Sequence, residues 1–359
     1  MFRNVYALMH DWIPLKLHFR EEQYNMIKSY LKVVDQGLAP PHMLLLGPTG
    51  TGKTITIKKI ISEFPESFRK SNVIYTVSGR TSYETLVSMT ESIVGKRFWG
   101  YSFVEVWKNF DKYLSKPTIV IIDEIDKMII PGKGDELLYH LSRRPLTTII
   151  AISNRLNVYD YIRDQRVRSS FTPRMIFFPQ YEVHELVEIL KCKVEEAFLP
   201  GVVDSGVIEY IAALAYRRDG DARYAIDLLR TSAEVAIRNG DSKVTIRHVD
   251  AAREKVEVEY IVKGLLNLKN THKLLLKIIA SKGQITISEI VDEYNKLAGY
   301  YGLSTLSSRR ISDYLVELEL LGFIRIIRKG MGRGNGVKWI VQLARRIDGK
   351  IIEKTIEKQ

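Results

Sequence analysis

One eight-residue segment, residues 47–54, constrains this chain more than any other feature of its sequence. Its sequence is Gly-Pro-Thr-Gly-Thr-Gly-Lys-Thr, which fits the pattern G-x-x-x-x-G-K-[ST] in full. A short apolar run, residues 43–46, precedes it, and residues 55–64 follow it with helical spacing. The glycines let the backbone curl until successive N–H groups face phosphate oxygens, and the start of the helix adds partial positive charge. The segment therefore predicts a phosphate-binding loop between a buried strand and a helix.

The residues expected to hold a nucleotide are those of the loop itself. Lys53 would reach the β- and γ-phosphates, and Thr54 would hold Mg²⁺ through its hydroxyl. The candidate nucleotide-binding residues are Gly47, Pro48, Thr49, Gly50, Thr51, Gly52, Lys53 and Thr54. The expected cofactors are ATP or ADP, together with Mg²⁺.

An acidic pair follows a second apolar run. Asp123 and Glu124 come directly after residues 119–122, which predict a buried strand. Asp123 would then stand at the carboxyl end of that strand and orient Mg²⁺ or its water, and Glu124 would act as general base on the attacking water. An acidic pair alone is usually a solvated strand end, but downstream of a phosphate-binding loop it indicates nucleotide hydrolysis. We expect a surface role for Asp126.

Short apolar runs alternate with helical stretches over the first half of the chain. The runs are residues 43–46, 73–77, 118–122, 147–152 and 174–178. Such alternation predicts an α/β core whose parallel sheet is covered on both faces. After Pro179 only helical patterns occur as far as about residue 264, which predicts an all-α domain.

The C-terminal part shows a third pattern, in which three helices precede two strands. The helical segments are residues 271–280, 286–297 and 305–321, and the strands are residues 323–328 and 337–343. With the basic, glycine-rich stretch between the strands, this pattern is typical of a winged helix. We therefore expect domains at residues 1–179, 180–264 and 265–359, and a charged tail from residue 348 that ends in a frayed helix or coil.

Positive charge is concentrated in the last of these domains. The chain has 54 Lys and Arg against 42 Asp and Glu, and residues 264–359 contain 17 of the former and 9 of the latter. The excess indicates a polyanionic partner, either nucleic acid or an acidic membrane surface. No apolar run approaches the ~20 residues of a membrane helix and no lipid-facing amphipathic stretch occurs, so we favour DNA and expect no membrane partner. The single cysteine, Cys192, excludes an intramolecular disulfide and a cysteine-based zinc site.

The third helix of a winged helix carries its base-reading residues near its start, where it enters the major groove. The candidates there are Ser307, Ser308, Arg309 and Arg310. An Arg that binds guanine through two hydrogen bonds provides ~1–3 kcal/mol of discrimination. Candidates for backbone or minor-groove contact in the hairpin are Lys329, Arg333 and Asn335. The alternative is a solvated helix start and a basic loop without a ligand.

These features together resemble the archaeal replication initiator AAA+ ATPases, relatives of the origin recognition complex and of the helicase-loading factor. The resemblance covers about residues 10–345. Its more specific pieces are Arg-Val-Arg-Ser-Ser-Phe at 166–171, Phe-Pro-Gln-Tyr at 178–181 and Gly-Asp-Ala-Arg-Tyr-Ala at 220–225. It implies an ATP-dependent initiator that binds duplex DNA at origins and helps to recruit or load the replicative helicase. Other initiator paralogues would be partners, and the location would be cytoplasmic and nucleoid-associated.

The resemblance also assigns roles to single residues. Lys53 and Thr54 would be the Walker A residues, and Asp123 and Glu124 the Walker B pair. Three further site residues follow from it: Asn154 as the first sensor, Arg223 as the second sensor on the lid, and Tyr181 near the base at the start of the lid. An Asn at the end of a strand can position the water against the γ-phosphate, although an Asn that caps a turn is about as common.

A helical insertion after the second strand is another feature that the resemblance implies. Residues 82–94 match it, and in the family this insertion contacts DNA. Lys96 and Arg97 follow it and are candidates for DNA contact, next to Phe98 and Trp99. The alternative is a solvated loop with one packed aromatic residue.

The chain departs from its relatives at Ser169 and Ser170, which occupy the place where some of them carry an arginine finger. Arg166 or Arg168 is left to act in trans, so we expect a slow ATPase that retains ADP after turnover. Two alternative functions remain open at this point. The first is an ADP-retaining, DNA-bound regulator that antagonises a paralogous initiator, and the second is another AAA+ machine whose winged helix binds protein.

Overall fold

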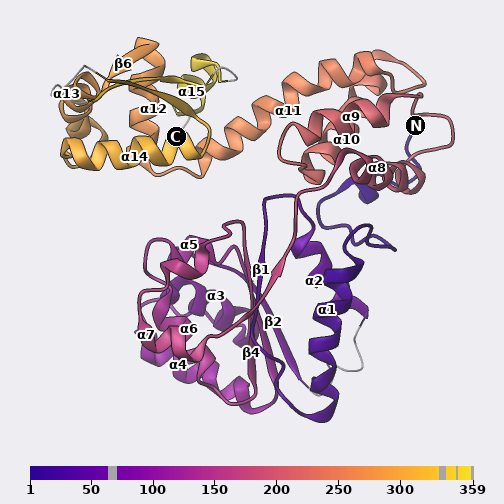
Figure 1. The fold of residues 1–359 in the computed structure, drawn as a ribbon, viewed down its shortest axis with the longest axis vertical. Helices are drawn as coiled ribbons and strands as arrows, with labels where there is room; N and C mark the ends of the chain where they lie inside the picture. Colours follow the sequence, from indigo (N-terminus) through magenta and orange to yellow (C-terminus); the bar gives the residue numbers. More distant parts are fainter. Residues whose placement is uncertain (64–70, 331–336, 345–346, 357–359) are drawn as a thin grey trace. The chain divides into compact units, whose positions relative to one another are not determined.

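The computed structural model describes residues 1–63, 71–330, 337–344 and 347–356 and divides the chain into two compact units (Figure 1). The first unit, Met1–Asp250, contains an α/β core with a parallel sheet and an all-α lid. The second unit, Ala251–Gln359, contains the winged helix. This fold class is the one expected from the sequence. No helix in the described part of the chain is both long enough and apolar enough to cross a membrane.

A five-stranded parallel sheet forms the centre of the first unit, in the order β2-β3-β4-β1-β5. The strands are β1 (Met43–Leu46), β2 (Asn72–Val77), β3 (Thr118–Asp123), β4 (Thr147–Ser153) and β5 (Arg174–Phe177). Every residue of β1, β3 and β4 is buried, as continuous apolar runs predict for strands covered on both faces. Because β4 lies between β1 and β3, the carboxyl ends of these three strands meet at one edge of the sheet.

Helices cover both faces of the sheet (Figure 1). Alternate strand residues belong to opposite cores: Met43 and Leu45 pack with one helical layer, and Leu44 and Leu46 with the other. The first layer consists of α1 (Glu21–Leu31) and α2 (Lys53–Glu63). The second consists of α3 (Ser82–Val94), α4 (Phe103–Asp111), α5 (Asp126–Ile129), α6 (Asp135–Ser142) and α7 (Gln165–Ser170). Short 3₁₀ helices in the core are η2 (Lys32–Gln36), η4 (Lys112–Ser115) and η5 (Val158–Tyr161).

The lid is built from α8 (Val183–Ala197), α9 (Val207–Tyr216), α10 (Ala222–Asn239) and the start of α11 (Ile246–Leu266). The N-terminal residues of the chain pack on it, around η1 (Val5–Leu8). Arg3 N donates to Ala197 O at 2.7 Å, and Lys193 Nζ donates to Ala7 O at 3.0 Å. The lid therefore includes the chain's first residues, which the sequence pattern did not separate from the core.

In the second unit, the three expected helices are α12 (Asn270–Lys282), α13 (Ile287–Leu297) and α14 (Ser308–Leu320), with η6 (Ala298–Tyr301) after α13. The antiparallel sheet has the order β6-β8-β7. Its strands are β6 (Gln284–Thr286), β7 (Ile324–Gly330) and β8 (Val337–Leu343). The short strand β6 was not expected, because three residues carry no periodic signal.

The charged tail, which was expected to end in a frayed helix or coil, is packed over its described residues, and residues 357–359 lie outside the described part. It contains a packed helix, α15 (Gly349–Ile356), in which Ile352 is fully buried in the winged-helix core. Ile347 joins the same core just before the helix. The sequence did not predict this helix because only a few of its side chains are apolar and the charged residues between them dominate the pattern.

Candidate functional site

The phosphate-binding loop follows β1 and is in direct contact with the lid. Gly50 and Gly52 have φ angles of +76° and +93°, which L side chains rarely adopt. A Cβ atom on Gly50 would lie 1.9 Å from Asp221 Oδ1, and one on Gly52 would lie 2.8 Å from Tyr181 Oη. Only glycine fits at either position. The glycines therefore serve the close approach of the lid as well as the curl of the loop.

Lys53 is the first residue of α2 and is 5 % exposed. Its Nζ donates hydrogen bonds to the carbonyl oxygens of Gly47 and Pro48, both at 2.7 Å. Burial, and next the positive charge of Arg223, lower the pKa of Lys53 to about 8. A phosphate group at the loop would reverse this shift, because an anion favours the charged ammonium.

The two predicted magnesium residues lie together at the carboxyl end of β3. Thr54 Oγ1 donates to Asp123 Oδ2 at 2.8 Å, and Glu124 N donates to Asp123 Oδ1 at 2.9 Å. Sequence reasoning missed a third partner: Tyr75 Oη donates to the same Oδ2 at 2.8 Å from the neighbouring strand β2. Burial, and then the negative charge of Asp123, raises the pKa of the Tyr75 hydroxyl, which therefore remains a donor.

This donor set fits Mg²⁺, which prefers hard oxygen ligands. The described residues contain no group of three or more His, Cys, Asp or Glu that could hold a metal by themselves. Mg²⁺ usually takes only one or two protein carboxylates and completes its shell with water and substrate phosphates. Thr54 and Asp123 beside a phosphate-binding loop match that mode.

Glu124 has a left-handed backbone with φ of +54°. For a residue other than Gly or Asn this conformation costs roughly 1–2 kcal/mol, and such strain is retained mainly at functional sites. The Glu124 carboxylate forms an ion pair with Lys127, and its side chain is 37 % exposed. The predicted general base therefore lies directly after the carboxyl end of β3, where its side chain is partly exposed.

Asp126 does not have the surface role predicted for it. Its Oδ1 accepts hydrogen bonds from Ser153 Oγ at 2.9 Å and from Asn154 N at 3.2 Å. It therefore fixes the end of β4, from which Asn154 extends. The Asn154 side-chain amide has no hydrogen-bond partner among the residues described, so its donors and acceptor are available to a ligand.

Arg223 lies in the first turn of α10, the lid helix that begins after Asp221. Asp221 Oδ1 caps this helix by accepting from Arg223 N at 2.8 Å and Tyr224 N at 3.2 Å. Burial raises the pKa of Asp221. Arg223 is exposed, and its charge lies close enough to Lys53 to act on it. The lid thus brings one cationic side chain to the loop.

Tyr181, at the start of the lid, is 5 % exposed and lies under the guanidinium group of Arg20. Burial raises the pKa of its hydroxyl to about 12. Sequence reasoning missed Arg20, because an Arg before a helix carries no signal of its own. Its contacts appear only in the folded chain.

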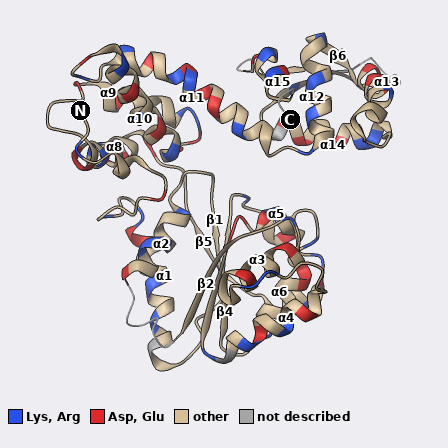
Figure 2. Ribbon diagram, turned by 180° about the vertical axis from the view of Figure 1, so that it is seen from behind, with Lys and Arg blue, Asp and Glu red and all other residues tan. Residues whose placement is uncertain are grey.

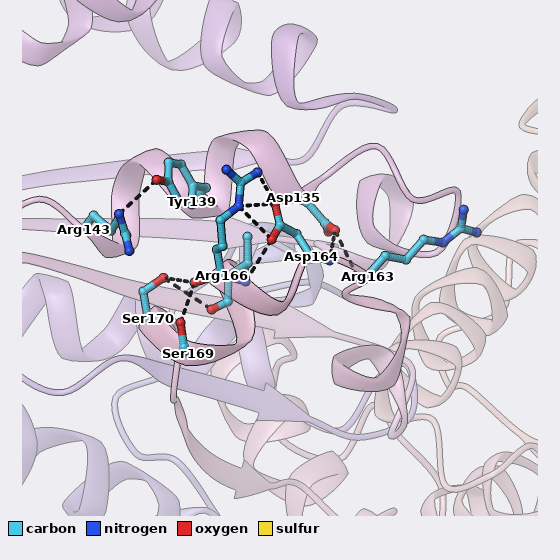
Figure 3. A network of polar contacts seen from close by, with 9 residues as sticks. Asp135, Tyr139, Arg143, Arg163, Asp164, Arg166, Ser169 and Ser170 are labelled. Atoms are coloured by element: carbon cyan, nitrogen blue, oxygen red, sulfur yellow. Dashed lines mark hydrogen bonds and ion pairs between the residues drawn. The ribbon is translucent and has the colours of Figure 1, made fainter.

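The two arginines considered for action in trans differ in their surroundings. Arg168 Nε and Nη2 each donate to a backbone carbonyl at 2.8 Å, those of Ile162 and Asp160. Arg166 is held by the Asp164 carboxylate, with Nη2 to Oδ2 at 2.7 Å, and its side chain is 70 % exposed (Figure 3). Its guanidinium also lies 5.0 Å from the ring centre of Tyr139. Both side chains are exposed, but Arg168 is held by carbonyls of its own core, whereas Arg166 is held by a single carboxylate.

Ser169 and Ser170 occupy the place where some relatives carry an arginine finger. Their hydroxyls form hydrogen bonds with residues of α6 and α7. Ser169 Oγ donates to Arg166 O at 2.9 Å (Figure 3). The hydroxyls of Ser170 and Ser142 lie 2.7 Å apart. These hydroxyls stabilise α7 and its contact with α6. They offer no cation to a neighbouring chain.

The predicted insertion is α3, and one side of this helix packs into the core through Leu86 and Met89. The loop after it contains the one packed aromatic residue of the alternative interpretation, and DNA contact at this loop stays a prediction. Phe98 is 2 % exposed, whereas Trp99 is 88 % exposed. Lys96 and Arg97 are exposed beside it, and the Lys96 ammonium lies 5.7 Å from the ring centre of Tyr101. One aromatic residue anchors the loop, and the other extends into solvent next to two cations.

The predicted base-reading residues lie at the start of α14, and all four are exposed: Ser307, Ser308, Arg309 and Arg310. Ser307 Oγ caps the helix by accepting from Arg310 N at 3.4 Å. The Arg310 guanidinium lies 5.8 Å from the ring centre of Tyr314. Arg309 has no ion pair or hydrogen bond from its side chain within the described part of the chain.

The hairpin candidates are only partly covered by the structure. Lys329 belongs to β7, where its backbone pairs with Lys338 of β8. Arg333 and Asn335 lie outside the described residues. Figure 2 shows Lys and Arg on the helices of both units, alternating with Asp and Glu.

Three family models match successive parts of the chain. The model for the ATPase family associated with various cellular activities (AAA) matches residues 43–179. The Cdc6 AAA+ ATPase-type lid domain matches residues 187–254, and the CDC6 C-terminal winged helix domain matches residues 273–349.

Whole-chain comparisons agree with these matches. An ORC1-type DNA replication protein of Methanothermobacter thermautotrophicus is 38% identical over 100% of this chain and 98% of its own length. The corresponding protein of Pyrococcus horikoshii is 36% identical over 92% of this chain and 85% of its own length. The solved structure of the Aeropyrum pernix ORC1 protein in complex with DNA is 31% identical, with a TM-score of 0.86 and coverage of 100% of this chain and 97% of that one. The chain belongs to the family of ORC1-type DNA replication proteins and carries that family's AAA ATPase core, Cdc6-type lid and winged helix.

Proposed function

We propose that the protein is an ATP-dependent replication initiator that binds duplex DNA at origins and helps to recruit or load the replicative helicase. The observation that carries this proposal is the contact between the lid and the phosphate-binding loop, through Asp221 at Gly50 and Tyr181 at Gly52. A nucleotide at this loop is bound where lid and core meet, so its phosphates can set the angle between them. An initiator needs such a coupling to change its competence for loading with its nucleotide state.

DNA binding is proposed from two lines of support. The Aeropyrum pernix ORC1 protein, 31% identical to this chain, has been solved in complex with DNA. The chain itself presents exposed cations at the start of α14 and in the loop after α3. We assign base contacts to the start of α14, backbone contacts to the hairpin, and a second contact to the insertion loop. The residues of this proposed surface are Lys96, Arg97, Ser307, Ser308, Arg309, Arg310, Lys329, Arg333 and Asn335.

We assign nucleotide binding to Lys53, the loop N–H groups and Tyr181. Thr54 and Asp123 would hold Mg²⁺, which when bound neutralises charge on the transferring phosphate. Glu124 takes a proton from the attacking water, and Asn154 orients that water. Arg223 stabilises the charge that develops on the γ-phosphate from the lid side. The proposed reaction is hydrolysis of ATP to ADP and phosphate.

We propose that turnover is slow in the isolated chain, because the described residues bring a single lid arginine, Arg223, to the loop and the Ser169–Ser170 pair offers no cation to a neighbour. Arg166 is the residue we assign to a neighbouring chain's nucleotide, since Arg168 is engaged by backbone carbonyls. We further propose domain boundaries at residues 179/180 and 264/265, with the N-terminal residues around η1 counted with the lid on which they pack. We also propose a location in the cytoplasm at the nucleoid, with initiator paralogues as partners.

Hydrolysis is tested with Glu124→Gln, which keeps the size of the side chain and removes the base. We expect turnover to fall about a hundredfold or more while ATP affinity stays within about twofold. Phosphate release measures the first quantity and equilibrium titration the second. Wild-type turnover in the variant would remove Glu124 from the role of base.

DNA binding is tested by recovering and sequencing the genomic fragments that the purified protein retains at physiological salt. Discrete peaks at replication start sites, sharing a short motif, support the initiator. Peaks confined to promoters would support a regulator of a paralogous initiator instead. A flat profile leaves only nonspecific binding and would contradict the proposal, in favour of a machine whose winged helix binds protein.

A further inference from the structure

We propose that Arg20 is a positioning residue that holds the phosphate-binding loop in register with the core–lid junction, so that nucleotide binding at the loop is transmitted to the lid. This inference rests on the proposed nucleotide-binding function and adds to it a residue that does not touch the nucleotide. Arg20 lies immediately before α1 and is 2 % exposed.

The guanidinium group of Arg20 joins three separate stretches of backbone. Nε donates to Thr51 O in the phosphate-binding loop at 2.8 Å. Nη2 donates to Pro179 O, at the end of the core, at 2.6 Å, and Nη1 donates to Phe19 O at 2.6 Å. The group also stacks on Tyr181, the first lid residue of the site, with 3.8 Å from the guanidinium carbon to the ring centre. One side chain thus binds loop, junction and lid.

The bond to Thr51 O has a consequence for the loop's donors. In a trans peptide the carbonyl oxygen of one residue and the N–H of the next point in opposite directions, because the unit is planar. The described chain has no cis peptide bonds. By fixing the Thr51 carbonyl, Arg20 therefore directs the Gly52 N–H to the opposite side of that peptide, the side on which a phosphate-binding loop presents its N–H groups.

On the lid side, the position of Tyr181 is equally constrained. Tyr181 Oη would lie 2.8 Å from a Cβ on Gly52, and a Cβ on Gly220 would lie 2.4 Å from Tyr181 O. Tyr181 is therefore clamped between the loop and the turn that precedes Asp221 and Arg223. A shift of the Thr51–Gly52 peptide on phosphate binding would move Arg20, the Pro179 carbonyl and Tyr181 together.

The chemistry of Arg20 is unusual for a purely structural residue. Burial lowers the pKa of Arg20, and the negative charges of Glu185 and Glu21 offset this only in part. No carboxylate forms a direct ion pair with Arg20 among the residues described. A buried cation without an anionic partner is costly, and an apolar residue of similar size would pack more cheaply. The planar fork of donors is what this position uses, because an arginine can reach three carbonyls at once and stack on a ring.

The experiment compares the full chain with Arg20→Met, Arg20→Lys and a matched control, Lys193→Met. Lys193 is also a buried cation that donates to a backbone carbonyl, but it lies in the lid, away from the loop. Affinity for Mg²⁺–ADP is measured by titration with a fluorescent ADP. Hydrogen–deuterium exchange, with and without saturating ADP, is followed in peptides covering residues 47–56 and 177–186.

We expect ADP to slow exchange in both peptides of the wild-type chain and of Lys193→Met. In Arg20→Met, the affinity for Mg²⁺–ADP should fall at least tenfold, because the variant loses interactions equivalent to about one hydrogen bond from a charged group. At saturating ADP, exchange should slow in the loop peptide but not in the junction peptide. Arg20→Lys keeps the charge but neither the fork nor the stacking, so it should regain part of the affinity without junction protection. A general loss of stability would instead speed exchange in both peptides whether or not ADP is present.

Wild-type affinity in Arg20→Met, or wild-type protection of its junction peptide by ADP, would overturn the inference. If Arg20→Met does not fold, Arg20→Lys decides, and full junction protection in that variant overturns the inference as well. Failure of the wild-type chain and the Lys193→Met control to bind ADP would instead overturn the proposed nucleotide function, and the inference with it.

Discussion

The proposed nucleotide site and the start of α14 place their charged residues in opposite surroundings. Lys53 and Asp123 are 5 % and 7 % exposed. Lys53 donates hydrogen bonds to carbonyl oxygens of its own loop, and Asp123 accepts one from Thr54. At α14, Arg309 and Arg310 are exposed, and Arg309 binds nothing else in the part of the chain that the structure describes. Buried, cross-linked groups act through fixed geometry, whereas exposed cations act through charge. Substitutions in the two regions should therefore differ in their dependence on pH and salt.

The largest effect is expected for Lys53→Met. The ammonium is the only side-chain cation within the loop itself, and without it affinity for Mg²⁺–ADP should fall about a hundredfold or more, the loss of a charge-assisted contact to phosphate. Isothermal titration calorimetry measures the change. Because burial already disfavours the Lys53 charge, the variant should melt no lower than wild type.

Lys59→Met is the matched control for that variant. Lys59 lies in the same helix, and its Nζ binds the carbonyl oxygens of Pro14 and Leu15 instead of those of the loop. We expect its ADP affinity to stay within about twofold of wild type. A tenfold change in affinity would correspond to about 1.4 kcal/mol, so the expected change in binding free energy is much smaller than that. Equal losses in both variants would show that the helix as a whole, and not the Lys53 ammonium, sets the affinity.

Arg309→Ala should give the next largest effect, on specific DNA only. Loss of a two-bond contact to guanine should weaken specific binding roughly tenfold or more and relax preference at one base pair, with an unchanged melting temperature. Arg310→Ala is the comparison, because its guanidinium already lies against Tyr314 and should contribute less. Titrations with specific and scrambled duplexes distinguish the two. A larger loss in Arg310→Ala would reverse the assignment of the base-reading residue.

The contrast between the two regions also explains what the sequence could and could not predict. The loop residues, Asp123 and the five strands follow from local patterns, because a motif and an apolar run each fix their own segment. Tyr75, Asp126 and Arg20 were missed or misjudged, since each acts through a residue far away in the chain. No local spacing encodes these contacts, which the strand order and the approach of the lid create.

The winged helix shows the same limit in a different way. Its three helices were predicted because each has a full apolar face, as in α14 with Ile311, Leu315 and Leu318. The strand β6 has three residues, and α15 contributes little more than Ile352 to the core. Elements that bury so few side chains leave too weak a pattern to be found without the rest of the fold.

A smaller effect should appear when pH is changed, and only at the nucleotide site. Lys53 loses its proton in the free protein near pH 8, while bound phosphate raises its pKa. Above about pH 8, ADP binding must therefore take up a proton, and affinity should fall, by at most about tenfold per pH unit. Calorimetry between pH 7 and 9.5 measures the slope. In Lys53→Met the slope should vanish, and a persisting slope would assign the proton to another group.

The smallest effect is expected at the insertion loop, where Lys96 and Trp99 separate charge from stacking. If Lys96 contacts a phosphate, Lys96→Ala should reduce the slope of log affinity against log salt by ~0.9, so that a fourfold rise in salt weakens DNA binding about threefold less than in wild type. Trp99→Ala should weaken binding without changing that slope, because ring contacts release no counterions. Both residues are exposed, so neither variant should lower the melting temperature. Unchanged slopes and affinities in both variants would limit the DNA surface to the winged helix, and the loop would then serve the core through Phe98 alone.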